Sequence, residues 1–242
     1  MRVKNKIKLG MPNLTYYGLD ESWLFKFCGN IHWDLLHEII DVWADGERFY
    51  ASFFHMQLKF DNNQNSFKEN DVIHFDSELF RYNDKIYRTV HKFDGGTLTM
   101  DTIFVKKQEQ GSLVKYKPKE INDSTCKQID NIGIVDHQIK KKQLLVNPLY
   151  DVGNLLSFPP SSLFNGVKIL YCANYLFLVS LSEFVQFNKI LGPIKEINIS
   201  YYGNMSISDN LYGQSVLLED EKSTETILSV NYRPIAYCEI TR

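Results

Sequence analysis

The segment from Glu47 to Phe60 holds the side chains best placed to do chemistry. It is rich in aromatic residues, as β-strands often are, and side chains alternate between the two faces of a strand. The even-numbered face ends in apolar residues such as Met56, so we expect it to point at the core. Tyr50 and Ser52 then become two hydroxyl groups on an apolar wall. A buried tyrosine hydroxyl needs a hydrogen-bond partner, so Tyr50 is either a structural residue bonded to a carbonyl or a reactive group.

His32 and Asn165 are two further candidates. His32 stands beside Trp33 in a predicted helix; with an ordinary pKa of about 6.5 it could act as an acid, a base or a donor, or it could simply be packed. Asn165-Gly166 directly precedes the second predicted helix. The free backbone N–H groups of a helix start can bind an anion or a developing oxyanion, although Asn-Gly also commonly marks a turn. The residues alone leave both alternatives open.

Two carboxylates offer a different chemistry. Asp34 and Glu38 are four residues apart and therefore share one face of the predicted helix. One of them could serve as a general base. Exposed, solvated carboxylates are the alternative at such positions.

Composition and charge narrow the classes of protein. The chain has 242 residues, 44% of them hydrophobic and 14% aromatic, and a net charge of −2. This balance predicts neither nucleic acid nor an anionic membrane as a partner. The basic start, Arg2 to Lys8, lacks the apolar run of a signal peptide. Polar residues interrupt the longest apolar stretch, Ile169 to Phe187, so no membrane span is predicted and we expect a cytoplasmic protein.

The cysteines and glycines predict neither a metal nor a cofactor. The four cysteines are far apart and form no CxxC pair, so we expect free thiols in a reducing compartment and neither a zinc site nor a disulfide framework. A glycine-rich phosphate loop is also missing from the sequence.

The order of predicted elements occurs twice along the chain. A helix over residues 20–41, capped by Asp20, precedes predicted strands at 47–60, 71–80, 84–93 and 96–106. A second helix over 167–188 precedes predicted strands at 194–202, 210–219 and 225–240. We therefore divide the chain into an N-terminal half (9–106), a polar lysine-rich connector (107–143) and a C-terminal half (144–242).

The second predicted helix is apolar on nearly every side. Such a helix is usually buried, here by a sheet that wraps around it. Together with the repeated order, this favours an α+β protein with a double hot dog fold, in which two antiparallel sheets each wrap a long central helix.

Four segments taken together resemble a known family. They are Met11-Pro12-Asn13-Leu14 through Trp23-Leu24, Gly29-Asn30-Ile31-His32-Trp33, Glu47 to Phe53, and Phe164-Asn165-Gly166-Val167 running into Leu170-Tyr171-Cys172-Ala173. The combination is similar to the bifunctional acyltransferase/decarboxylases of leinamycin-type polyketide biosynthesis. The resemblance runs from about residue 9 to the C-terminus and is weakest across 107–143.

The resemblance implies a double hot dog fold and a specific reaction. Members take a methylmalonyl group from coenzyme A, load it on an acyl carrier protein and decarboxylate it to propionyl. Tyr50 matches the tyrosine held to be essential in the family's substrate channel. The implied substrate is a CoA or phosphopantetheine thioester, with no metal or redox cofactor, and His32, Ser52 and Asn165 would orient it.

The implied chemistry makes physical demands on Tyr50. Decarboxylation of a malonyl-type thioester leaves an enolate, so a donor must lie where its oxygen develops charge. A phenol with an ordinary pKa of about 10 is protonated at neutral pH. We therefore favour Tyr50 as a hydrogen-bond donor over Tyr50 as a nucleophile.

Two other functions remain open from the sequence. A hot dog enzyme that hydrolyses or dehydrates an acyl thioester would use Asp34 or Glu38 more than Tyr50. A non-catalytic module would only bind an acyl carrier protein or an acyl chain. The sequence does not specify the acyl group or the oligomeric state, for which a homodimer is one alternative.

Overall fold

A computed structural model of the chain describes residues 1–40, 49–61, 67–107, 113–118, 121–122, 124–131, 138, 140, 143–144, 153–157, 163–165 and 170–242. The predicted helix start at 167–169 and much of the predicted connector fall outside these residues.

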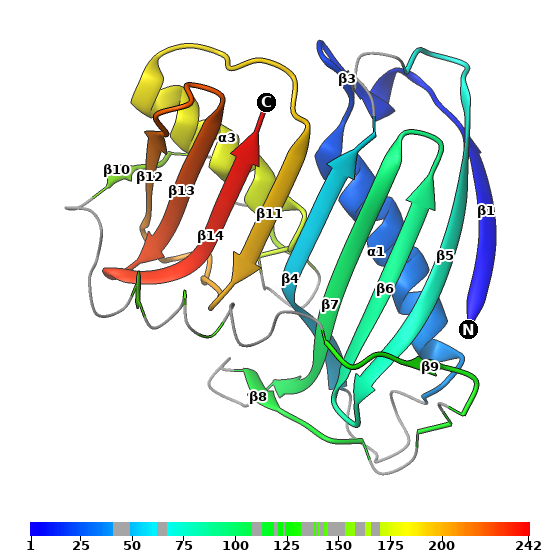
Figure 1. Cartoon of the computed structure of the whole chain (residues 1–242). Coiled ribbons are helices and arrows are strands. Elements are labelled where there is room, and N and C mark those ends of the chain that lie inside the picture. The colour runs from blue at the N-terminus through cyan, green and yellow to red at the C-terminus, as the bar shows by residue number, and fades with distance from the viewer. Residues whose placement is uncertain are drawn as a thin grey trace.

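The described residues form one large antiparallel sheet with two long helices on one side of it (Figure 1). The sheet has twelve strands, ten of them in the order β1-β5-β6-β7-β4-β11-β14-β13-β12-β10, while β8 pairs with β7 and β9 with β5. The α+β class is therefore confirmed. The expectation of two separate sheets is wrong, because β4 and β11 pair and join both halves into one sheet.

The part of the chain before residue 132 contains one long helix among its described residues, and most of the predicted strands lie at the expected places. Its elements are β1 (Arg2–Lys8), η1 (Met11–Asn13), β2 (Leu14–Thr15), β3 (Gly18–Leu19), α1 (Glu21–His37), β4 (Phe49–Phe60), β5 (Val72–Asn83), β6 (Ile86–Phe93), β7 (Gly96–Lys107), β8 (Leu113–Lys115) and β9 (Lys127–Gln128). The basic start, which was not predicted to be a strand, forms β1 and pairs with β5 along its whole length.

The C-terminal half repeats this plan with fewer strands. Its elements are β10 (Asn154–Leu155), α3 (Asn174–Phe187), β11 (Glu196–Tyr201), β12 (Leu211–Leu217), β13 (Ser223–Val230) and β14 (Arg233–Thr241). The single strand expected at 225–240 is in fact a hairpin. Asn231 and Tyr232 turn the chain with φ angles of 50° and 62°, in the left-handed region that non-glycine residues seldom adopt.

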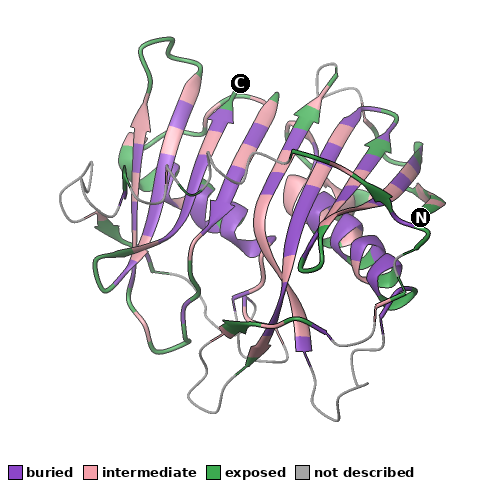
Figure 2. Ribbon diagram, turned by 60° about the horizontal axis from the view of Figure 1, so that its bottom comes forward, coloured by how far each residue is buried: buried purple, intermediate pink, exposed green. Residues whose placement is uncertain are grey.

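The helix α1 buries the apolar stripe that the sequence indicated. The expectation that the second helix is buried on nearly every side is wrong, because α3 leaves Phe177, Phe184 and Val185 exposed. Asp20 caps α1 by accepting a hydrogen bond from the backbone N–H of Trp23 at 3.0 Å. Buried residues follow on α1 at helical spacing, among them Leu24, Cys28 and Leu35. Figure 2 shows the buried surface concentrated on the helices and on alternate strand positions. No helix within the described residues is long and apolar enough to cross a membrane.

Gly213 lets α3 pack closely against β12. A Cβ at this position would lie 2.6 Å from Oγ of Ser182 on α3 and 2.8 Å from Cδ1 of Leu156. The Ser182 hydroxyl is 2.9 Å from that of Ser215, so it is held in place. The missing side chain therefore sets how near the helix comes to the sheet.

We expect Gly213→Ala to lower the free energy of unfolding by about 1–3 kcal/mol, since an added methyl group would overpack the contact. Gly192→Ala is the matched control, because a Cβ at Gly192 meets nothing within 4 Å. Urea unfolding measures the free energy of unfolding of both variants. Equal values for the two would contradict this account of Gly213.

Candidate functional site

The side chains of Tyr50 and Ser52 lie on the face of β4 that points away from the helices, so the expectation that they face the core is wrong. The pairing of β4 with β7 shifts register between Phe53 and His55, as a β-bulge does. After the bulge, Met56 and Leu58 point inward as predicted. Before the bulge, the odd-numbered residues point inward instead of the even-numbered ones. Phe49 is buried against α1 there, and alternation turns Tyr50 and Ser52 outward.

His32 is fully buried between α1 and the sheet. Its Nδ1 is 2.5 Å from Oγ1 of Thr89 and its Nε2 is 2.9 Å from Oγ1 of Thr102. Burial lowers the pKa of His32 from 6.5 to about 3, with a partial opposing effect of Asp101. The ring is therefore neutral at ordinary pH and has both nitrogens occupied. This matches the structural alternative for His32 better than a role in orienting a substrate.

Asn165 lies beside the start of α3. Its neighbour Phe164 forms an isolated β-bridge with Leu170, and the carbonyl of Leu163 accepts hydrogen bonds from the backbone N–H of Tyr171 and the side chain of Asn174. The expectation that Asn165 directly precedes the second helix is wrong, because α3 begins only at Asn174. The role of Asn165 in orienting a substrate stays a prediction.

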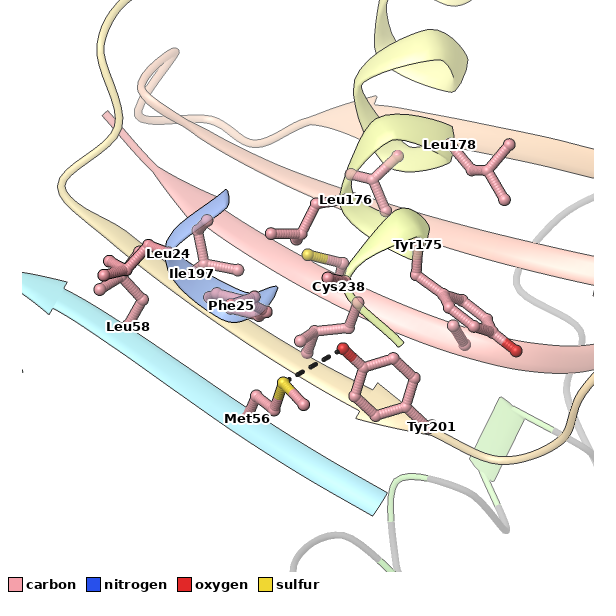
Figure 3. Close-up of a cluster of buried hydrophobic side chains, with 14 of the residues drawn as sticks. Leu24, Phe25, Met56, Leu58, Tyr175, Leu176, Leu178, Ile197, Tyr201 and Cys238 are labelled. Carbon is pink, nitrogen blue, oxygen red and sulfur yellow. Dashed lines mark hydrogen bonds between the residues drawn. The ribbon is translucent and has the colours of Figure 1, made fainter. Parts of the chain in front are cut away.

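Tyr175 of α3 and Tyr201 of β11 lie together near the seam where β4 meets β11 (Figure 3). Tyr175 and Tyr201 pack edge to face with ring centroids 5.1 Å apart. The hydroxyl of Tyr175 donates to the carbonyl of Gly203 and that of Tyr201 to the carbonyl of Cys172, both at 3.1 Å. These two hydroxyls are therefore occupied by the backbone.

Tyr171 differs from these two tyrosines. Its hydroxyl oxygen is 3.3 Å from where a Cβ would stand at Gly29 in the middle of α1, and among the described residues it makes no hydrogen bond. The residue is half-buried. Burial, and secondly Cys172, raises the pKa of Tyr171 above its ordinary value, so the hydroxyl keeps its proton. Tyr171 thus offers a free donor at the seam, and the pattern of the sequence gave no signal that singled it out.

Cys172 is the neighbouring group that could act as a nucleophile. Burial is the main reason that the pKa of its thiol rises from 9.0 to about 12. Only the thiolate is strongly nucleophilic. The cysteine therefore contributes packing rather than covalent chemistry at this place.

A polar cluster crosses the same seam on the opposite face of the sheet. Nδ1 of His55 is 3.0 Å from Oδ2 of Asp101, and its Nε2 is 2.8 Å from Oδ1 of Asn198 on β11. Arg88 donates two hydrogen bonds to Asp101, at 2.6 and 2.7 Å. The Asp101 side chain has no exposed surface. Sequence reasoning missed this cluster because His55 was considered only by its strand face.

The two helix carboxylates occupy less suitable positions. Asp34 and Glu38 are both exposed, on the side of α1 that faces solvent. Neither is held against another ionisable side chain by an ion pair among the described residues. The geometry therefore does not favour them as a buried general base.

Comparisons with known proteins identify the fold. No family model matches the chain, and no curated protein sequence matches it. A 12:0-ACP thioesterase from Umbellularia californica matches with a TM-score of 0.75 at 10% identity, over 99% of this chain and 96% of that one. An acyl-ACP thioesterase from Bacteroides thetaiotaomicron matches with a TM-score of 0.65 at 9% identity, over 99% and 97%. HtdX of Mycobacterium tuberculosis matches with a TM-score of 0.52 at 9% identity, over 99% of each chain.

The chain therefore has a hot dog-like α+β fold along its length. This confirms the coarse architecture that the sequence predicted. The leinamycin-type resemblance, the repetition as a double hot dog and the boundaries of the two halves stay predictions.

Proposed function

We propose that this protein is a double hot dog enzyme that hydrolyses acyl thioesters carried by coenzyme A or an acyl carrier protein. Hydrolysis releases the carboxylic acid and returns the free thiol of the carrier. This is the alternative that the sequence left open, and it now fits better than acyl transfer with decarboxylation.

One observation carries the proposal. The likeness to the Umbellularia 12:0-ACP thioesterase extends over 99% of this chain with a TM-score of 0.75. Both helices, the joined sheet and the seam between the halves thus have counterparts in an enzyme whose substrate is an acyl thioester. Similar folds host different functions, so the residues at the seam must support the same chemistry.

The seam offers an apolar environment for an acyl chain. Both halves contribute to a single cluster of buried side chains that contains Phe25 and Met56 from one half and Leu176 and Ile199 from the other. An acyl chain at this place would replace apolar contacts between the helices. The thioester would then lie near the start of α3, next to Tyr171 and the loop that contains Asn165.

Tyr171 supplies the donor that hydrolysis needs. Attack of water on a thioester places negative charge on the carbonyl oxygen, and a positioned donor stabilises that charge. The raised pKa keeps the Tyr171 hydroxyl protonated at neutral pH. The hydroxyl lies 3.3 Å from where a Cβ of Gly29 would stand, so this glycine lets the Tyr171 side chain approach α1. Asn165 is a second candidate for orienting the thioester.

We expect Tyr171→Phe to lower kcat for acyl-thioester hydrolysis by about 10²–10³-fold, the usual effect of removing one oxyanion donor. The assay measures free thiol and free acid from acyl-CoA and acyl-carrier substrates of several chain lengths. Tyr175→Phe is the matched control: its hydroxyl serves the carbonyl of Gly203, so kcat stays within a few-fold. Wild-type turnover by Tyr171→Phe would remove Tyr171 from the mechanism, and no hydrolysis of any thioester would refute the proposed function.

Methylmalonyl transfer and decarboxylation is a second candidate, favoured by one feature of β4. Its pairing with β11 covers only His55–Lys59, so the part of β4 that carries Tyr50 and Ser52 extends past the end of that partner. Tyr50 stands at this end of the seam. Incubation with methylmalonyl-CoA and a carrier protein, followed by mass spectrometry of the carrier, tests this candidate. Propionyl-carrier formed by wild type and lost in Tyr50→Phe would support it over hydrolysis.

A further inference from the structure

A pocket of about 340 Å³ lies at the end of α3 that is remote from Tyr171. Four separate segments meet there. Lys189 comes from the loop after α3 and Lys195 directly precedes β11. Lys222 lies in the turn between β12 and β13, and Arg242 directly follows β14. Residues from all parts of the C-terminal half thus converge on one concave surface, which the proposed hydrolysis does not use.

The pocket carries an excess of positive charge although the chain as a whole carries a net charge of −2. Four cationic side chains line it, and Glu221 is the one carboxylate beside them. Within the part of the chain that the structure describes, Lys189, Lys195 and Lys222 form no salt bridge. Such unpaired cations at one concavity attract an anion more strongly than scattered surface lysines do.

Arg242 is the fixed member of this set. One of its terminal nitrogens donates to the carboxylate of Glu183 at 2.6 Å, and the other donates to the hydroxyl of Thr224 at 3.1 Å. Its side chain is only 11% exposed, and that of Glu183 is 6% exposed. The carboxylate of Glu183 offsets the charge of Arg242, so the three lysines are the cations left to attract a phosphate.

Apolar surface adjoins the cations. Ile190 at the pocket is 75% exposed. Phe184 and Phe177 on α3 are 48% and 45% exposed. Phe184 and Phe177 lie on α3, between the pocket and Tyr171 along the chain. With 14 residues at about 1.5 Å each, α3 separates the two places by about 20 Å, a distance that an extended pantetheine chain can bridge.

We propose that the basic pocket binds the phosphate groups of a coenzyme A or phosphopantetheine thioester while its acyl end lies at the seam. The proposal rests on the thioester substrate of the proposed function. It adds a second site, at the far end of α3, that recognises the carrier part of the substrate rather than the acyl group.

Binding of unacylated coenzyme A, measured by calorimetry, tests this without turnover. We expect the double variant Lys189→Ala/Lys222→Ala to weaken binding at least about tenfold through loss of charge-assisted contacts, and added salt to weaken binding by wild type. Lys6→Ala/Lys8→Ala, at exposed positions on β1, removes the same charge elsewhere and should leave affinity unchanged. Dephospho-coenzyme A and phosphopantetheine distinguish which phosphate the pocket holds; pantetheine, which has none, should bind equally to wild type and the double variant.

Unchanged affinity of the double variant for coenzyme A would overturn the proposal. Loss of affinity for a carrier protein without its arm, with coenzyme A binding intact, would also overturn it and indicate a protein-docking surface instead. The outcome is separate from that of the proposed function. Lysine-dependent coenzyme A binding without hydrolysis of any thioester would refute the hydrolase alone, and hydrolysis with lysine-independent binding would refute the pocket alone.

Discussion

Replacing Asp101 by alanine will lower the free energy of unfolding by about 3–5 kcal/mol, the usual cost of removing one partner from a buried charge cluster. Asp101 has no exposed side-chain surface and is bonded to both Arg88 and His55, whose side chains are 20% and 18% exposed. Without the carboxylate, the guanidinium of Arg88 stays largely buried and loses the counter-charge that Asp101 supplies. His55 also loses the group that holds its ring toward β11. Chemical unfolding in urea measures the loss.

Asp94→Ala is a matched control for this variant. Asp94 also pairs with a histidine, His74, at the same 3.0 Å distance, but their side chains are 49% and 65% exposed. Exposed pairs contribute about 0–1 kcal/mol, so this variant should unfold close to wild type. Similar losses in both variants would show that burial of Asp101 is not what makes its pairing important.

Acid will destabilise the protein through His32. The unfolded chain protonates this histidine below about pH 6.5, whereas burial lowers the pKa in the folded protein to about 3. Between these values the unfolded state binds more protons, so stability is complete above pH 6.5 and falls as the pH decreases toward 3. At pH 4.5, two pH units below the unfolded pKa, His32 alone should cost about 3 kcal/mol.

Comparing how the free energy of unfolding changes with pH in wild type and in a His32 variant isolates the contribution of His32. Urea unfolding at pH 7 and pH 4.5 should show a smaller acid loss in His32→Gln than in wild type, whatever the stability of the variant at pH 7. Burial, and secondly the neighbouring His32, also lowers the pKa of His91, so part of the slope will remain. An unchanged slope in His32→Gln would show that this ring can be protonated in the folded protein.

The helices and most strands could be predicted because their residues carry periodic apolar patterns. The stripe on α1 and its Asp20 cap are local features, and the structure has both. The strand β1 was not predicted, because Val3 and Ile7 are its only large apolar residues and most of the others are basic. Its strand conformation comes from pairing with β5, a partner some 70 residues away, and no local pattern encodes such a contact.

The orientation of Tyr50 could not be read from alternation alone. A single bulged residue between Phe53 and His55 exchanges the two faces of β4, and nothing in the aromatic run marks where it falls. Phe49 and Phe53 are as apolar as Met56 and Leu58, so both faces looked suitable for the core. The hairpin turn at Asn231 and Tyr232 was missed for a similar reason, because tyrosine replaces the glycine that usually signals such a turn.

The site at the seam depends on contacts between distant parts of the chain. Tyr171 meets Gly29 only after the two helices have packed, and His55 meets Asn198 only after β4 and β11 have paired. The sequence placed Asn165 near the second helix because the two are adjacent along the chain. It had no means to place residues from both halves together.

The joint between β4 and β11 also bears on how the protein is synthesised. Hairpins build each half from neighbouring strands, but the joint brings together distant residues such as His55 and Asn198, 143 positions apart along the chain. Closing so long a loop costs more entropy than closing a hairpin, so we expect the joint to form last. Until β11 leaves the ribosome, β4 presents an open edge to other nascent chains, and such edges promote aggregation. Fusing or truncating the protein between its halves would make that temporary exposure permanent.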